Sequence, residues 1–261
     1  MRTAILDAVA SVACYMIAGT LLVTASEAVG ITDRYLVTLL LDFSTIAVLA
    51  RGTGKAAWMP GGIRSHPRLS RGAVAALAVM AFALVWMAGV SGSGAVSLAL
   101  SGGAASAVSY ADAFAGTSPA IGIALQLLVA PVAEELLVRG RAYGKLRDVL
   151  PMPVATIMSS VLFAAMHGTL FHLPTTLLLG AFLACLYEGT GSLATCMIAH
   201  ATANALTLSL AQVEAVPAGL LSPAAAVALS IAAIAAVVAL GRVVCEARTA
   251  SMAGSAEETS G

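Results

Sequence analysis

Apolar stretches about as long as a membrane span recur along the chain, separated by short polar segments. Crossing the hydrocarbon core of a bilayer takes about 20 mostly apolar residues in a helix. On this basis the pattern predicts eight helices, the second and sixth of them short, at residues 4–24, 35–50, 73–92, 119–140, 153–171, 173–188, 192–210 and 221–243. The predicted fold is therefore an all-α polytopic membrane protein with about eight transmembrane helices.

Composition strengthens this prediction. Of the 261 residues, 60% are apolar and only 10% are charged, whereas a soluble domain has roughly 25% charged residues. The net charge is zero, so the charge balance predicts no nucleic-acid partner, and the expected partner is the lipid bilayer. The four cysteines are scattered, without a C-x-x-C pair, and predict no disulfide framework.

Basic residues favour one orientation in the membrane. They cluster in segments 51–72 and 139–147 and near both ends of the chain. Cytoplasmic loops carry an excess of Lys and Arg. Eight crossings from a cytoplasmic N-terminus place twelve of the thirteen basic residues inside and leave Arg34 outside. This predicts a multi-pass plasma-membrane protein with both termini in the cytoplasm. The first apolar run is long and interrupted by Asp7 and Tyr15, which favours a retained helix over a cleaved signal peptide.

The pattern divides the chain into four regions. Residues 1–118 hold the first three helices and a Gly/Ser/Ala-rich stretch, 91–118, which we expect to be a loose external loop or a re-entrant piece. Residues 119–210 hold the fourth to seventh helices, and 211–246 hold the eighth. The small and polar residues of 247–261 predict a disordered tail.

Two carboxylates and an arginine lie within the predicted fourth helix. Ionisable residues are costly inside a membrane unless they are paired or wetted, so they mark a functional site by default. Glu135 and Arg139 are four residues apart with the glutamate first, which is the favourable order for an ion pair. The alternative is a purely structural pair at the cytoplasmic edge, with Arg139 extending to the interface. Glu134 points about 100° away and has no such partner, which makes it the candidate general base.

Two histidines and an asparagine lie on later helices. His200 and Asn204 share one face of the predicted seventh helix. Their N–H groups are of the kind that stabilises a tetrahedral oxyanion, although a lone histidine is more often a structural, hydrogen-bonded residue. His167 follows Phe163 by one turn on the predicted fifth helix.

We expect these side chains to converge on one wet cavity, formed by Glu134, His167, His200 and Asn204, with Glu135 and Arg139 paired at its rim. The predicted depths disagree, however. At 1.5 Å per residue, Glu134 lies roughly 10 Å and His167 roughly 20 Å from the cytoplasmic ends of their helices. The predicted fifth helix must therefore begin inside the cytoplasm or tilt strongly.

Two further acids lie in or beside predicted helices. Asp42 lies in the middle of the second helix, where we expect a neighbouring helix to provide its partner, with a functional role as the alternative. Glu188 precedes a Gly-Thr-Gly-Ser turn at the predicted cytoplasmic interface. A carboxylate at that interface needs no special explanation.

The three polar segments, in this order, resemble the motifs of the CPBP intramembrane proteases, which include the type II CAAX prenyl endopeptidases and abortive-infection proteins. The matching segments are Glu134-Glu135-x-x-x-Arg139, Phe163-x-x-x-His167 and His200-x-x-x-Asn204. The stretch 187–193, leading into the last motif, is also similar to the family pattern. The resemblance covers roughly residues 120–210.

The resemblance implies an intramembrane site that is open to the cytoplasm. There Glu134 and His167 would activate a water molecule. His200 and Asn204 would bind the carbonyl oxygen of the scissile bond. Arg139 would hold Glu135 or the terminus of the substrate.

The predicted function is thus that of an intramembrane endopeptidase acting on a membrane-associated protein or peptide. No cofactor is expected, since the H-E-x-x-H pattern of zinc helices is missing; a zinc-like divalent metal is the alternative. The Ala-rich chain is typical of bacteria, which generally do not prenylate their proteins, so a prenylated substrate is not expected. Two other functions stay open: a non-catalytic immunity or assembly factor of the same fold, and a proton-coupled transporter, which inverted repeats would favour.

Overall fold

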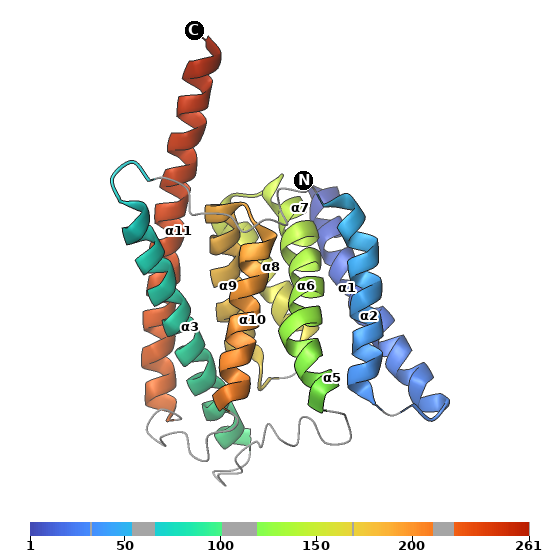
Figure 1. The fold of residues 1–261 in the computed structure, drawn as a ribbon. Helices are drawn as coiled ribbons and strands as arrows, with labels where there is room; N and C mark the ends of the chain where they lie inside the picture. The colour runs from blue at the N-terminus through green and yellow to red at the C-terminus, as the bar shows by residue number, and fades with distance from the viewer. Residues whose placement is uncertain (32, 54–65, 101–118, 169, 211–221, 261) are drawn as a thin grey trace.

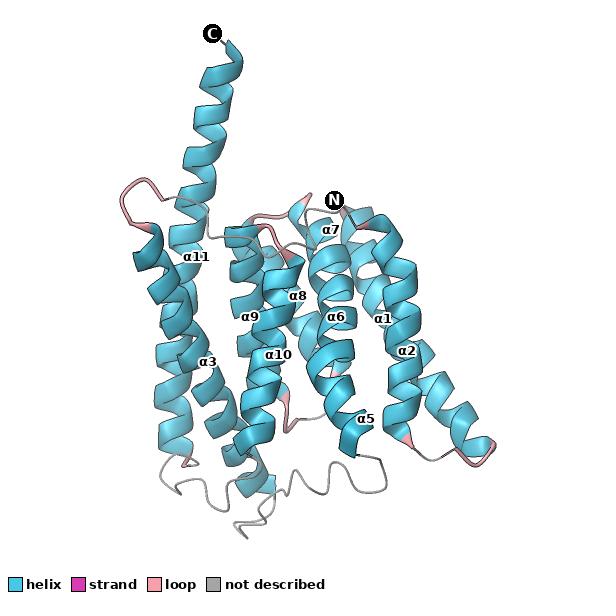
Figure 2. Cartoon of the chain, in the orientation of Figure 1, coloured by secondary structure: helices cyan, strands magenta, loops and turns pink. Residues whose placement is uncertain are grey.

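The computed structural model describes residues 1–31, 33–53, 66–100, 119–168, 170–210 and 222–260, and these parts consist of helices joined by loops (Figures 1 and 2). The all-α prediction is confirmed, and each of the eight predicted helices is present. The helical elements are α1 (Arg2–Ala28), α2 (Arg34–Leu49), η1 (Ala50–Gly52), α3 (Arg71–Leu100), α5 (Pro119–Ala124), η3 (Leu125–Val129), α6 (Ala130–Glu135), η4 (Leu136–Tyr143), α7 (Gly144–Arg147), α8 (Met152–Met166), α9 (Leu173–Thr190), α10 (Leu193–Leu210) and α11 (Pro223–Ser260).

Helix length and apolar outer faces identify a multi-pass membrane protein. Among the described residues, 6 helices are long and apolar enough to cross a bilayer: α1, α2, α3, the rod from α5 to α7, α9 and α11. At 1.5 Å per residue the apolar α8 is about 22 Å long, short of a full crossing. Large apolar side chains are exposed on the outside of the bundle, as lipid contact requires; examples are Leu21, Val48, Val79, Ile157 and Ile231.

The helices form a central group flanked by two pairs (Figure 1). On one flank α3 packs against α11, and both contact α9; on the other flank α1 packs against α2. The central group consists of α6, α8, α9 and α10, with α8 and α10 both packed against α9. All three polar motifs belong to this central group and its direct extension η4, so the neighbouring helices shield them from lipid.

The prediction that the external loop begins at residue 91 is wrong, because α3 continues to Leu100. Its glycines mark a close helix contact. A Cβ atom on Gly89 would lie 2.9 Å from Thr175 Oγ1, and one on Gly92 would lie 2.7 Å from Pro174 Cβ. Small residues let helices approach closely in membranes, and here they bring α3 against α9. The rest of the predicted loop, 101–118, lies outside the described residues.

The predicted fourth helix is longer than expected. It was expected to end at residue 140, but α5, η3, α6, η4 and α7 form one continuous rod over residues 119–147. Measured from its basic end, Glu134 therefore lies roughly 20 Å along the rod, and His167 lies about as far along α8 from Met152. The discrepancy between their predicted depths disappears without a tilted helix.

Two other helix ends differ from the prediction. The fifth helix, expected over 153–171, ends at Met166, because Gly168 takes the left-handed conformation (φ 64°) that closes helices. The last helix, expected to end at 243, continues to Ser260 through most of the segment predicted to be disordered, and extends past the rest of the bundle (Figure 1). Alanine has the highest helix propensity of any residue, and the segment contains no proline.

The orientation in the membrane stays a prediction that labelling can test. In a cysteine-free background, Ile31→Cys and Leu69→Cys place single thiols at exposed positions before α2 and before α3. A membrane-impermeant maleimide added to intact cells should label position 31 and reach position 69 only after the cells are permeabilised. Equal labelling of both positions in intact cells would overturn the topology.

Candidate active site

The backbone around the first motif departs from a regular α-helix. Two π-helical segments, η3 and η4, lie directly before and after α6, whose last residues are Glu134 and Glu135. Widened turns of this kind occur frequently at functional sites. In the first of them the carbonyl oxygen of Gln126 accepts a hydrogen bond from Asn204 Nδ2 at 2.8 Å, which joins α10 to this rod.

Glu135 and Arg139 form an ion pair in the centre of the protein. Arg139 Nη1 lies 2.9 Å from Glu135 Oε1, and both side chains are 0% exposed. Arg139 Nη2 donates to the carbonyl oxygen of Gly180 at 2.9 Å, and its guanidinium lies 4.6 Å from the centre of the Phe163 ring. The alternative that Arg139 extends to the interface is therefore wrong, and so is the expectation that the pair lies at a rim.

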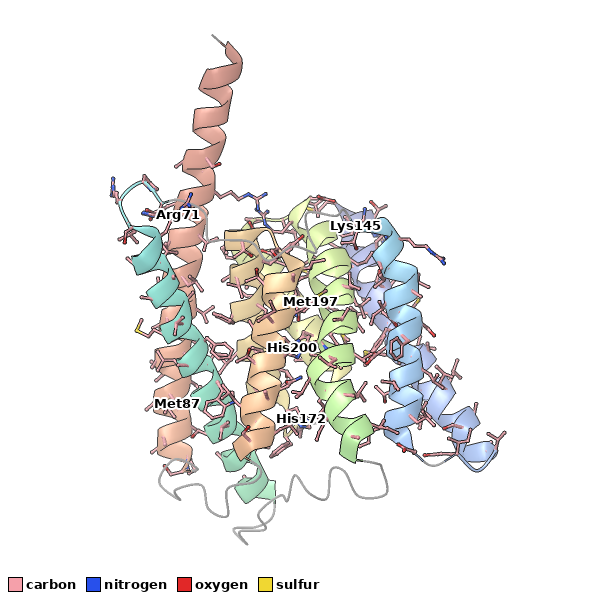
Figure 3. All side chains as sticks on the ribbon, viewed as in Figure 1. Arg71, Met87, Lys145, His172, Met197 and His200 are labelled. Atoms are coloured by element: carbon pink, nitrogen blue, oxygen red, sulfur yellow. The ribbon has the colours of Figure 1, made fainter. Side chains whose placement is uncertain are left out.

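His200 connects this buried pair to Glu134. Its Nδ1 lies 3.0 Å from Glu135 Oε1, and its Nε2 lies 3.9 Å from Glu134 Oε2. A carboxylate paired with an arginine accepts hydrogen bonds, so we assign the ring hydrogen to Nδ1. This bond fixes the orientation of the imidazole and turns Nε2 toward Glu134. His200 lies about halfway between the two ends of the bundle, whereas Arg71 and Lys145 lie at the end that holds the N-terminus (Figure 3).

One carboxylate oxygen of Glu134 accepts no hydrogen bond from the described residues. Its side chain is 15% exposed. Within the described ranges Oε2 is buried without a hydrogen-bond partner, and the nearby polar group is His200 Nε2. A carboxylate oxygen that is shielded and uncommitted can take up and release a proton during a reaction.

His167 is close to this cluster but is separated from it by Phe163. Its Nδ1 donates to the carbonyl oxygen of Phe163 at 2.9 Å, which leaves Nε2 as an acceptor in the neutral ring. The Phe163 ring centre lies 5.0 Å from that of His167 and 5.5 Å from that of His200. No hydrogen bond or ion pair among the described residues joins His167 to Glu134. The structure thus brings His200, rather than His167, next to Glu134.

A cavity of about 890 Å³ lies beside the cluster, between α1, α2 and the η4–α7 end of the long rod. Tyr15 and Leu41 line it on one side, and Leu136, Gly140 and Lys145 line it on the other. Glu134 itself does not line this space. A cavity shared by Glu134, His167, His200 and Asn204 therefore stays a prediction.

Two buried acids have partners that the sequence did not reveal. Glu188 is 4% exposed and accepts hydrogen bonds from Tyr143 Oη at 2.9 Å, from Arg147 and from Arg248. It joins α9 to the last residue of η4, to the last residue of α7 and to α11. A buried carboxylate with three partners does need an explanation, contrary to the expectation, and no local pattern connects residues this far apart in the sequence.

Asp42 is the second of these acids. It is 0% exposed and accepts a hydrogen bond from Tyr15 Oη at 2.7 Å, so a neighbouring helix does provide its partner.

The described side chains, as they are arranged in the structure, do not form a site for the zinc-like metal that was the alternative. No three His, Cys, Asp or Glu side chains within the described residues lie close enough together to hold a metal ion. A zinc site needs three or four protein ligands, and Glu135 is already committed to Arg139 and His200.

Comparison with known families gives one match. Residues 116–206 match the family model described as type II CAAX prenyl endopeptidase Rce1-like. This range contains all three polar motifs. No curated protein and no solved structure matches the chain.

Proposed function

Residues 116–206 belong to the Rce1-like branch of the CPBP intramembrane proteases, and on that premise we propose that this chain hydrolyses a peptide bond of a membrane-associated protein or peptide. The family supports an endopeptidase of the CAAX type acting within the membrane. We further propose that it works in the plasma membrane with both termini in the cytoplasm. The observation that carries the proposal is the shielded, uncommitted Oε2 of Glu134, which lies 3.9 Å from His200 Nε2.

Glu134 is the proposed general base. It removes a proton from a water molecule, whose oxygen attacks the carbonyl carbon of the scissile bond. A C–O bond forms while the π electrons of the carbonyl move to its oxygen. When the tetrahedral intermediate collapses, the C–N bond breaks, and Glu134 returns its proton to the amide nitrogen that leaves.

His200 and Asn204 are the proposed oxyanion donors. With Nδ1 bonded to Glu135, a protonated His200 ring donates from Nε2, and the Glu135 carboxylate stabilises its positive charge. Asn204 uses one amide hydrogen on Gln126 and retains a second one for the oxyanion.

The remaining motif residues hold the proposed catalytic groups in position. Arg139 holds Glu135 in place at Nδ1 of the His200 ring. His167 packs against the ring of Phe163, which also lies against the His200 ring, and so helps to hold that ring in place.

Substrate trapping tests this function. A Glu134→Gln variant, expressed in native membranes, should retain substrates that the wild-type protein cleaves and releases. We expect affinity purification followed by mass spectrometry to recover specific membrane-associated peptides with the variant, and the cleaved forms of the same peptides with the wild type. Identical partners in uncleaved form on both proteins would instead favour a binding factor.

Chelation separates the metal-free reaction from the metal-dependent alternative. Because the proposed reaction uses side chains alone, we expect cleavage by the purified protein to be unchanged after exhaustive treatment with EDTA and 1,10-phenanthroline. Elemental analysis of the active protein should find zinc far below one ion per chain. Loss of cleavage on chelation, restored by added zinc, would contradict the account based on Glu134 alone.

A further inference from the structure

The cavity between α1, α2 and the η4–α7 end of the long rod is charged at one end and apolar at the other. Asp7 and Lys145 line it near the end of the bundle that holds the N-terminus, where Figure 3 labels Lys145. Leu41 and Leu136 line it at the opposite end. From Asp7 to Ala18, the last α1 residue that lines it, the cavity extends about 17 Å along the helix. This is a little more than half of the roughly 30 Å hydrocarbon core, so the cavity is about as long as one membrane leaflet is thick.

Four charged side chains line the polar end of the cavity, and they are Asp7, Arg141, Lys145 and Asp148. In the part of the chain that the structure describes, none of the four forms an ion pair. Arg141 has one long contact, from its Nε to Ser11 Oγ at 3.5 Å. Two positive and two negative groups are therefore available to a ligand. Charged pockets between transmembrane helices at the membrane surface bind lipid head groups, and this set complements a head group that has both charges.

The hydroxyl groups along the cavity wall already donate within their own helices. Ser11, Ser44 and Thr45 line the cavity, and each donates its hydroxyl hydrogen to the backbone carbonyl oxygen four residues earlier, at 2.7, 2.8 and 2.9 Å respectively. A peptide in this space would need partners for its own backbone N–H and C=O groups, whereas a hydrocarbon chain needs none. The wall therefore favours an acyl chain over a polypeptide.

We propose that this cavity binds one phospholipid with a zwitterionic head group of the phosphatidylethanolamine class. Arg141 and Lys145 bind its phosphate, and Asp7 and Asp148 bind its primary ammonium, through charge-assisted hydrogen bonds. An acyl chain extends along the cavity toward Leu136. The cavity volume of about 890 Å³ lies within the range of ligand sites in proteins. Most of the lining belongs to α1 and α2, which lie outside the family match, so the site goes beyond the proposed function.

Native mass spectrometry of the full-length protein tests the site. The protein is depleted of lipid in detergent and titrated with phosphatidylethanolamine, phosphatidylcholine or phosphatidylglycerol. We expect one phosphatidylethanolamine per chain, bound about fivefold more tightly than either of the others, because exposed ion pairs each contribute modestly. The choline ammonium has no N–H to donate, and phosphatidylglycerol has no cation. Equal binding of all three lipids would overturn the proposal.

Gly144→Phe is the variant that fills the cavity. Gly144 lines this space, and a Cβ atom there would have no heavy atom within 4 Å, so the ring can enter the cavity without displacing a neighbour. This variant should lose the bound lipid. Gly72→Phe is the matched control on α3, away from the cavity, where a Cβ atom would meet only Ser70 Oγ at 3.8 Å; it should bind the lipid as the wild type does.

Two double variants test the head-group contacts separately. Arg141→Gln with Lys145→Gln removes the proposed phosphate ligands and should weaken binding of all three lipids. Asp7→Asn with Asp148→Asn removes the proposed ammonium ligands and should reverse the preference in favour of phosphatidylglycerol. Unchanged affinity and selectivity in both double variants would contradict the head-group assignment.

Two further outcomes keep the lipid distinct from other ligands and from the proposed function. Glycerophosphoethanolamine, which is the head group without acyl chains, should not displace the bound lipid; equal competition would overturn the role of the apolar end. A Gly144→Phe protein that keeps its lipid but no longer cleaves a trapped substrate would overturn the proposal and assign the cavity to the peptide. Selective lipid binding by a protein that cleaves nothing would reject the protease and support the lipid site.

Discussion

Glu134→Ala should abolish cleavage of the trapped substrate while the protein stays folded in detergent. The change removes the carboxylate that takes the proton from water, and loss of a general base costs at least roughly 10² in turnover. Because Glu134 Oε2 has no hydrogen-bond partner among the described residues, its removal breaks little of the fold. Single-turnover cleavage assays measure the loss, and thermal unfolding with size-exclusion chromatography checks the fold.

The control for this prediction is a carboxylate of the same protein far from the motifs. Glu246 on α11 has a side chain that is 60% exposed, and Glu246→Gln should cleave at the wild-type rate. His200→Ala should be as inactive as Glu134→Ala. Asn204→Ala should be badly impaired but not dead, because His200 still donates to the oxyanion; losing one such donor costs about 10²–10³. Full processing by Glu134→Ala would remove the protease function and leave that of a binding factor.

Arg139→Ala should be the most destabilising single change among the motif residues. It leaves the carboxylate of Glu135 buried and without its cation, and it also removes the donor to the Gly180 carbonyl oxygen. Breaking a buried ion pair by removing one partner typically costs about 3–5 kcal/mol. We expect a large drop in Tm and in the yield of folded protein in detergent, with activity lost in parallel.

A double variant distinguishes a stranded charge from lost packing. Glu135→Gln combined with Arg139→Met removes both charges and approximately keeps both volumes. Replacing a buried pair with neutral groups is often close to neutral for stability, so the double variant should be more stable than Arg139→Ala although it is equally inactive. A double variant that is less stable than Arg139→Ala would show that packing, and not the unpaired charge, causes the loss.

The sequence predicted those features that depend on residues close to one another along a single helix. Hydropathy located all eight helices, and the i,i+4 spacing predicted the Glu135–Arg139 contact. The predicted helix ends were less accurate where a residue type is common both in loops and within helices. Gly92 belongs to the stretch that indicated a loop but provides a close contact with α9, and the basic residues at 141–147 indicated a connecting segment but form the last turns of a helix.

Contacts between helices could not be predicted from spacing. Which histidine lies beside Glu134 depends on the rotation and depth of α8 and α10. The position of the Phe163 ring, in contact with both His167 and His200, cannot be predicted from the spacing of residues along the chain. The π-helical turns around α6 were missed for the same reason, because they change the rotation of the helix without changing its apolar pattern. The motif residues were found through chemistry and resemblance, and their roles stay proposals.

The Glu188 cluster has a consequence for the order in which the chain assembles in the membrane. Tyr143 and Arg147 precede Glu188 in the sequence, so they are synthesised before it, but Arg248 follows it on α11. During biosynthesis the carboxylate can therefore bind its first partners as soon as α9 is inserted, whereas Arg248 arrives only with α11. The contacts around Glu188 close only after α11 has been synthesised, so nascent chains that end before α11 should be preferred targets of membrane quality-control proteases.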